Sequence, residues 1–424
     1  MREMKDSGIE WIGQIPKDWD VVPHKRIMHK VKKICEQYSG EDIISLTMNG
    51  VIRRDLTAGG KMPTSFDGYQ YVKPNDLLLC LFDIDVTPRC VGVVKDYGVT
   101  SPAYSRFVMH DGHYNAYYDY LLRAIDDDKV FVHLSKNLRS SLTESDFGAI
   151  KTCVPPLAEQ ERIAAFLDAE CAEIDAVLEK TRASIEEYKK LKQAVITQAV
   201  TKGIRGDRPM KDSGIEWVGE IANEFAVYKF KYLLKTPMQY GANEAGITFD
   251  KTLPRYIRIT DITLDGRLKQ DNRLCIEDTV AKPYILQDGD LLFARSGGTV
   301  GKSFLYKQSY GNAAFAGYLI RAVVNRTIAV PKYVYYYTNS SIYDTWKNSI
   351  FIQSTIQNIG ADRYSNMPIV VPNNIEEQRS IVEYLNERCV GIDALIRKKQ
   401  QHLTEIENYK KSLIYEYVTG KKEA

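Results

Sequence analysis

Two stretches of the chain carry apolar side chains with the spacing of a coiled-coil helix. The apolar positions are separated alternately by four and three residues, which places them along one face of an α-helix. We therefore predict a long helix within residues 155–205 and another within 372–424; one over 159–202 would be roughly 65 Å long. The predicted seam comprises Leu167, Cys171, Ile174, Leu178 and Ile185 in the first helix and Leu385, Cys389, Ile392, Ile396 and Leu403 in the second.

The two seams have the same phase, because adding 218 to a position in the first gives the corresponding position in the second. The polar residues that interrupt the seams also match, since Lys399 and Lys410 of the second helix correspond to Thr181 and Lys192 of the first. Lysine is compatible with such a position, because its stem can lie along apolar surface while its head reaches water. A helix alone would leave its stripe in water, so we expect the two helices to form an antiparallel coiled coil. The alternative is two separate helices, each lying on its own domain.

The chain also contains an internal repeat, which indicates an architecture built from two similar units. Met4–Trp11 recurs letter for letter as Met210–Trp217, and Glu159–Ala176 is matched in part by Glu377–Ala394. The predicted domains are a first variable domain over 1–154 with a shared opening at 4–28, a long helix over 155–205, a second variable domain over 206–371 with a shared opening at 210–234, and a long helix over 372–424.

The two variable segments share only thin echoes, such as residues 75–78 against 289–292. Both have the composition of mixed α/β domains, with short apolar runs bounded by turn residues. The pattern predicts strands at 76–82, 90–94, 256–260, 290–294 and 317–322, and helices at 114–124 and 332–339. The predicted fold class is α+β: two mixed α/β domains separated by two long helices in an antiparallel coiled coil, as a pseudo-two-fold internal repeat.

Composition narrows the class of protein. The net charge is only +2, so bulk charge does not indicate nucleic-acid binding. The seven cysteines include no C-x-x-C pair, and no apolar run approaches the roughly 20 residues that span a bilayer. The opening residues lack the apolar core of a secretory signal. We therefore expect a cytoplasmic protein with reduced thiols.

One stretch of the chain is similar to a nucleotide-binding motif. Ser296–Ser303 ends like a phosphate-binding loop, but Ser296 stands where that motif requires its first glycine. A glycine-rich hairpin is therefore favoured over a nucleotide site. The sequence has no H-E-x-x-H or G-x-S-x-G motif, and its six histidines show no metal-ligand spacing. We predict no catalytic residue and no metal site in this chain.

Four segments together resemble one known family. Residues 4–19, Val154–Gln160, Tyr256–Ile262 and Leu291–Lys302 are similar to the opening, the helix start and the target-recognition domains of specificity subunits of type I restriction–modification systems. The second half departs at 373–375, which suggests an Asn cap for its long helix in place of proline. The resemblance extends over both halves of the chain.

The resemblance implies a non-catalytic reader of double-stranded DNA. Each variable domain would read one half of a bipartite site, and the helices would set the spacing and dock two modification subunits, which methylate adenine. No cofactor is expected in this chain; S-adenosylmethionine, ATP and Mg are expected in the modification and restriction subunits. The alternatives are an enzyme in its own right, such as a solitary methyltransferase or nuclease, and a coiled-coil scaffold with no DNA role.

Polar and aromatic side chains in the predicted strand ends and loops are the candidates for DNA contact, because arginine, threonine and similar residues reach phosphates and base edges. For any one of them, an ordinary surface position is the alternative. The candidates are Thr87, Arg89, Tyr104, Ser105, Arg106, Lys136, Asn137, Arg139 and Ser140 in the first domain, and Tyr240, Gly241, Arg258, Thr260, Arg295, Ser296, Thr299, Lys302, Ser354 and Gln357 in the second.

Overall fold

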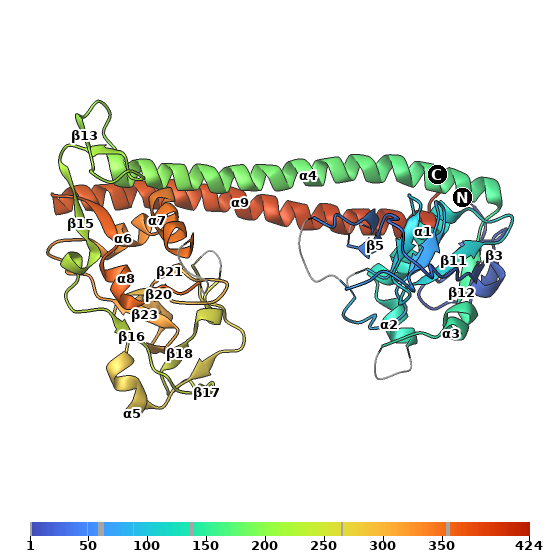
Figure 1. The fold of residues 1–424 in the computed structure, drawn as a ribbon, viewed down its shortest axis with the longest axis horizontal. Helices are drawn as coiled ribbons and strands as arrows, with labels where there is room; N and C mark the ends of the chain where they lie inside the picture. Colours follow the sequence, from blue (N-terminus) through green and yellow to red (C-terminus); the bar gives the residue numbers. More distant parts are fainter. Residues whose placement is uncertain are drawn as a thin grey trace. The chain divides into compact units, whose positions relative to one another are not determined.

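A computed structural model gives the fold (Figure 1). It describes residues 2–48, 50–57, 63–87, 89–135, 140–263, 266–352 and 357–424. The chain forms two compact units: unit 1 comprises Met1–Arg182 with Gln401–Ala424, and unit 2 comprises Ala183–Gln400. The long helices α4 (Leu157–Lys202) and α9 (Ile375–Val418) each contribute one end to each unit.

Unit 1 is built around a four-stranded antiparallel sheet of order β4-β11-β8-β9. Its strands are β4 (Met28–Lys30), β11 (Ser105–Met109), β8 (Leu77–Leu79) and β9 (Val91–Val93). The antiparallel pairs around it are β1 (Met4–Asp6) with β2 (Gln14–Pro16), β3 (Asp20–Pro23) with β12 (Lys151–Val154), β5 (Ile44–Thr47) with β6 (Gly50–Arg53), and β7 (Gln70–Val72) with β10 (Gly98–Thr100).

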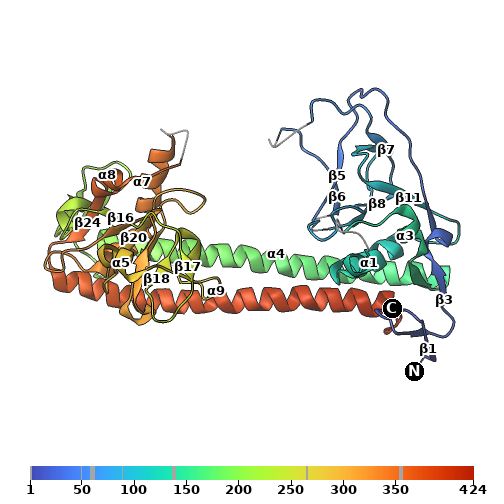
Figure 2. The ribbon, with the colours of Figure 1, turned by 90° about the horizontal axis from the view of Figure 1, so that it is seen from below.

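Helices cover this sheet and join it to α4. They are α1 (Asn115–Asp127), α2 (Val130–Leu134) and α3 (Glu144–Ala149). Helix α1 packs against β9 and lies along the first turns of α4 (Figure 2). Its tyrosines Tyr117, Tyr118 and Tyr120 are buried, as expected for residues that pack a helix against a core.

Unit 2 contains two four-stranded sheets. The first, of order β16-β23-β20-β21, is antiparallel, and in the second, β17-β19-β18-β22, the pair β18–β22 is parallel. Their strands are β16 (Gln239–Tyr240), β23 (Leu319–Ala322), β20 (Leu291–Ala294), β21 (Ser303–Leu305), β17 (Ile247–Thr248), β19 (Leu274–Cys275), β18 (Arg255–Ile257) and β22 (Ala313–Phe315).

Two further antiparallel pairs and four helices complete unit 2. The pairs are β13 (Met210–Asp212) with β14 (Glu220–Ala222), and β15 (Phe225–Lys229) with β24 (Pro368–Pro372). The helices are α5 (Asp278–Ala281), α6 (Pro331–Tyr337), α7 (Ser341–Ile352) and α8 (Ala361–Ser365). Helices α6 and α7 lie against the ends of α4 and α9 within this unit (Figure 1).

The long helices run antiparallel in each unit. In unit 1 the start of α4 packs against the end of α9, where the rings of Phe166 and Tyr417 are 4.4 Å apart. In unit 2 the end of α4 packs with the start of α9, where Lys192 pairs with Asp393 at 2.7 Å. Every predicted seam residue is buried or half-buried, and Asn374 caps α9 by accepting a 2.9 Å hydrogen bond from the backbone N–H of Glu376. The predicted fold class and helix pairing are confirmed.

Some details differ from the sequence prediction, among them two that concern the lysines of the seam and the strand at 256–260. The lysine heads at the polar seam positions do not simply reach water, because Lys192 pairs with Asp393 and Lys410 pairs with Asp175 at 2.6 Å. The strand predicted at 256–260 is shorter, since a 3-10 turn over Ile259–Asp261 ends β18. Among the described residues, no helix is long and apolar enough to cross a membrane.

Candidate nucleic-acid interface

The antiparallel sheets of the two units correspond strand by strand. Strands β8 and β20 follow the same turn, in which Asn75 and Gly289 adopt a left-handed conformation, with φ of 73° and 88°. The next residue, Asp76 or Asp290, is buried and accepts a hydrogen bond from a backbone N–H three residues earlier. The weak similarity between residues 75–78 and 289–292 therefore reflects a turn that recurs in both units. The β8–β9 and β20–β21 connections accordingly occupy corresponding sheet edges.

In unit 2 this edge is the hairpin connection of residues 295–302, which confirms a hairpin within Ser296–Ser303. The guanidinium of Arg295 lies 5.1 Å above the ring of Tyr240, whose hydroxyl accepts a 3.0 Å hydrogen bond from Ala361. Ser296 pairs with Asn358, which places the exposed Gln357 beside the connection. The structure thus brings four of the predicted contact residues to one edge.

Sequence reasoning missed one residue at this edge. The ring of Tyr318 is 62% exposed, and its carbonyl accepts a 3.1 Å hydrogen bond from the backbone N–H of Arg295. Tyr318 was placed inside the predicted strand 317–322, but β23 begins one residue later, at Leu319. An exposed aromatic ring beside an arginine is typical of a surface that stacks on bases or sugars.

The other predicted residues of unit 2 divide by their contacts. Gly241 lets two backbones approach, because an added Cβ would lie 2.4 Å from the carbonyl oxygens of both Phe315 and Ala316. Arg258 is held by Asp261 at 2.7 Å, whereas Thr260 is exposed. Thr299 and Lys302 line a small hollow of the connection. Ser354 lies outside the described residues.

In unit 1 the corresponding edge is the connection 80–90. Thr87 donates a 2.8 Å hydrogen bond to the carbonyl of Asp83, and Arg89 donates a 3.2 Å hydrogen bond to the carbonyl of Met48. The carbonyl of Ser140 accepts a 3.0 Å hydrogen bond from Ile84. Thr87, Arg89 and Ser140 therefore gather at this edge, while Lys136, Asn137 and Arg139 lie outside the described residues.

Three predicted residues of unit 1 lie in the sheet strand β11 or directly before it. Arg106 is 6% exposed and pairs with Asp76 at 2.6 Å, just as Arg321 faces Asp290 at 3.7 Å in unit 2. Ser105 begins β11, and Tyr104 is half-buried, which raises the pKa of its hydroxyl. The guanidinium of Arg106 is thus engaged inside the domain.

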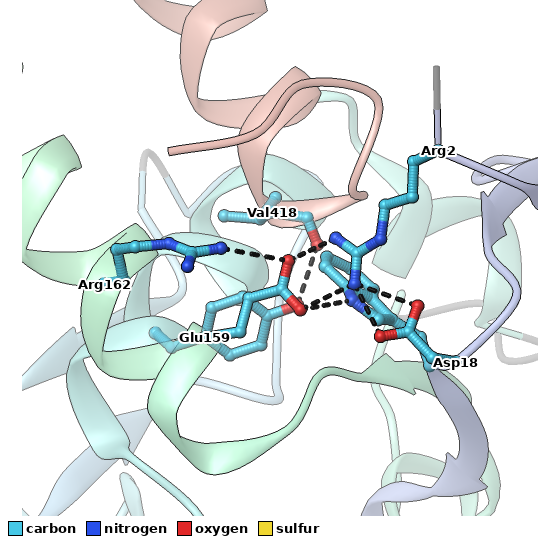
Figure 3. Close-up of polar contacts among 7 residues, drawn as sticks. Arg2, Asp18, Glu159, Arg162 and Val418 are labelled. Atoms are coloured by element: carbon cyan, nitrogen blue, oxygen red, sulfur yellow. Dashed lines mark hydrogen bonds and ion pairs between the residues drawn. The ribbon is translucent and has the colours of Figure 1, made fainter.

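A second set of polar contacts fastens each opening segment to a long helix. In unit 1 Arg2 lies between Glu159 and Asp18, and the indole N–H of Trp19 donates a 2.9 Å hydrogen bond to Glu159 (Figure 3). Burial opposes ionisation of Glu159, but the hydrogen bonds from Arg2 and Trp19 outweigh it and lower the pKa of that carboxyl.

The same arrangement recurs in unit 2. Arg208 pairs with Glu377 at 2.7 Å and lies 5.5 Å from the centre of the Phe225 ring. Arg208 and Phe225 occupy the positions of Arg2 and Trp19 in the repeat of the opening segment, and Glu377 occupies that of Glu159 in the repeat of the long helix. The two repeats found in the sequence therefore meet at one side-chain cluster in each unit.

Gln160 and Gln378, which follow these two glutamates, join each variable domain to the start of a long helix. Gln160 and Gln378 are fully buried. Gln160 accepts a 2.8 Å hydrogen bond from the backbone N–H of Tyr114, which precedes α1, and Gln378 accepts one of 2.9 Å from Val330, which precedes α6. Each glutamine also donates to the carbonyl just before its own helix. A glutamine is suited to this position because it offers a donor and an acceptor together.

Tyrosines of α1 and α6 also make matching contacts in the two units. Together with the contacts of the glutamates and glutamines, these form what we call the common frame. Tyr117 donates a 2.8 Å hydrogen bond to the carbonyl of Val418 at the end of α9, and Tyr333 donates one of 3.1 Å to the carbonyl of Val200 at the end of α4. Val418 and Val200 occupy matching positions in the repeat of the long helices. Each variable domain is therefore joined to the start of one long helix and the end of the other.

The structure places no group of three or more His, Cys, Asp or Glu side chains close enough together to hold a metal ion, within the ranges given above. What the two sheet edges offer is arginine, hydroxyl and aromatic groups on a rigid support.

Comparison with known proteins points to one family. Residues 276–407 match the model of the type I restriction modification DNA specificity domain. The chain is 24% identical over 288 residues to the EcoKI specificity subunit of Escherichia coli K12, and 24% identical over 280 residues to the MjaVIII specificity subunit of Methanocaldococcus jannaschii. The chain is therefore similar to type I restriction specificity subunits.

The matched parts cover less than two thirds of these relatives. The first alignment spans 66% of this chain and 60% of the E. coli subunit, and the second spans 65% and 63%. A solved structure on assembly and conformational transition of the type I restriction–modification system is 15% identical, with a TM-score of 0.68 over 95% of this chain and 98% of the other. The chain therefore shares the fold of that structure over nearly its whole length.

Proposed function

We propose that this chain is the non-catalytic, sequence-reading specificity subunit of a type I restriction–modification complex, and that each variable domain reads one half of a bipartite DNA site. One observation carries this proposal. The β8–β9 and β20–β21 connections occupy corresponding sheet edges on a recurring frame, yet they expose different polar and aromatic side chains. A common support with unlike edges suits two unlike half-sites.

The chemistry of the edges fits DNA. In unit 2 the arginine at position 295 is held over an aromatic ring, which limits its rotamers and leaves donors for phosphate or guanine. The connection of unit 1 exposes Val86, and Arg89 bonds the carbonyl of the exposed Met48 in the β5–β6 turn. Apolar groups there would contact thymine methyls or sugars.

The long helices would set the distance between the half-sites and dock the modification subunits. The shared openings Met4–Trp11 and Met210–Trp217 and the matched contacts of Glu159 and Glu377 present the same features twice. Two similar surfaces favour two copies of one partner, here the modification subunits with their S-adenosylmethionine. ATP and Mg would belong to the restriction subunits.

Reconstitution tests the proposal. Full-length chain would be combined with its modification subunits, and methylated adenines would be mapped on genomic DNA. We expect methylation at a two-part sequence with a fixed gap, and none with the chain alone. Methylation or cleavage by the chain alone would instead establish an enzyme, and a complex that shows no sequence preference would leave only a scaffold.

A further inference from the structure

Unit 2 contains a cavity between the last turns of α4, helices α6 and α7, and the β20–β21 connection. Its volume is about 480 Å³, within the roughly 300–1,000 Å³ range of ligand pockets. Gly301, Lys302 and Ser303 line it, so it borders the edge proposed to read bases. Any ligand in this cavity would lie beside that edge.

The lining is basic. Lys189, Lys190, Lys192, Lys302 and Lys347 line the cavity, together with the carboxylates of Glu186 and Asp344. Glu186 pairs with Lys189 at 2.7 Å, and Asp344 pairs with Lys347 at 2.6 Å. Even when Asp393, which pairs with Lys192, is included, the lysines outnumber the carboxylates by five to three. An excess of positive charge on concave walls attracts anions.

Unit 1 has a hollow at the corresponding place, with the opposite charge balance. Its volume is about 140 Å³, and Lys411 and Ile414 of α9 line it. Gln193 and Ile196 of α4, which occupy the matching positions of the helix repeat, line the cavity of unit 2. The remaining charged groups of the hollow are the carboxylates of Asp127 and Asp128. The repeated frame thus carries a basic cavity in one unit and a small acidic hollow in the other.

We infer that the cavity of unit 2 binds phosphodiester groups of the DNA backbone, and that the acidic hollow at the matching place in unit 1 does not. This inference rests on the proposed function. Backbone phosphates flank the bases that a protein reads and position the duplex without specifying sequence. Lysines on α4 and α7 beside the β20–β21 connection supply that contact. Unit 2 therefore contributes more of the salt-dependent affinity than unit 1.

The test is the salt dependence of binding to a duplex of random sequence, measured with full-length chain in complex with its modification subunits. Each phosphate contact contributes about 0.9 to the slope of log K against log salt. We expect Lys190→Gln with Lys347→Gln to reduce the slope by roughly 1.8 and to weaken all sequences alike. Lys398→Gln with Lys411→Gln removes the same charge elsewhere and is expected to leave the slope unchanged.

An equal slope for the two double variants would overturn the inference. Should the first fail to fold, Lys190→Gln alone, on an exposed position of α4, carries the test with a shift of about 0.9. If inorganic phosphate stabilises wild type but not the variant while the DNA slope is unchanged, the cavity takes free phosphate and the inference is wrong. Random duplex makes these results independent of base reading, which the methylation map tests separately.

Discussion

The side chains that join the variable domains to the long helices are the same in the two units, whereas those that line the sheet edges differ. Glu159 and Glu377, like Gln160 and Gln378, are the same residue in both units and make matching contacts. At the edges, Arg89 bonds a backbone carbonyl, whereas Arg295 lies over a tyrosine ring. Polar residues that recur at the repeat offset hold the fold, and those that do not recur are the candidates for reading DNA.

The largest expected effect is a loss of stability when a buried glutamine is replaced. Gln378→Ala removes three hydrogen bonds and leaves buried backbone groups without partners, so we expect a loss of about 3 kcal/mol in the free energy of unfolding. Gln160→Ala removes two and should cost somewhat less. Denaturant unfolding measures both, with exposed Gln357→Ala as the control. A loss below about 0.5 kcal/mol, the range of ordinary surface substitutions, would remove these residues from the frame.

At the sheet edge the expected loss is in DNA recognition. Arg295→Ala should weaken binding to the methylated sequence by about 1–3 kcal/mol and relax base preference in one half-site. Its effect on unfolding should stay below about 1 kcal/mol, the range of an exposed cation–π contact. Binding to matched and mismatched duplexes gives the measurement, and Arg379→Ala, an exposed arginine on α9, is the control. An unaltered base preference would show that Arg295 at this sheet edge does not read bases.

Acid should weaken the contacts of Glu159. Since the pKa of this carboxyl is lowered in the folded protein, its stabilisation is present above the ordinary glutamate value of about 4.3 and is lost as the pH falls below it. We expect Glu159→Gln to be less stable than wild type by about 1–2 kcal/mol at neutral pH. The difference should shrink steadily in acid, and unfolding curves over that range would show it. A difference independent of pH would exclude the ionised carboxylate as its source.

The smallest expected effect belongs to the ion pairs between the long helices. Lys192 and Asp393 are each about a third exposed, so their coupling should be only about 0.3–0.5 kcal/mol. A double-mutant cycle with Lys192→Met and Asp393→Ala measures it, and the Lys410–Asp175 cycle should give a similar value. High salt should abolish both couplings. Coupling above about 2 kcal/mol, near the upper end for residues within one polar network, would mean that these pairs belong with the buried frame.

Much of the frame was predictable because it repeats. The heptad phase located the antiparallel helices, and the offset of 218 marked Gln160 with Gln378 even though their hydrogen bonds could not be foreseen. Arg106 shows the limit. It was predicted to contact DNA, yet it lies buried against Asp76, as Arg321 lies near Asp290. The recurrence of an Asp and an Arg in both halves was the available signal.

The sheet edges were harder to predict, since their residues come together only through the fold. Tyr240 and Arg295 are far apart in sequence and stack because β16 and β20 both pair with β23. Tyr318 was missed because β23 begins two residues later than predicted, so that an expected strand position lies in an exposed turn. Periodicity locates elements well and their ends poorly, and the reading residues lie at the ends.

Domain exchange shows whether each variable domain reads its own half-site independently of the other. Residues 29–154 would be replaced by the corresponding segment of another type I specificity subunit, and methylated adenines would be mapped with the same modification subunits. We expect one half of the recognised sequence to change while the other half and the gap stay as they were. A change in both halves would contradict independent reading by the two domains.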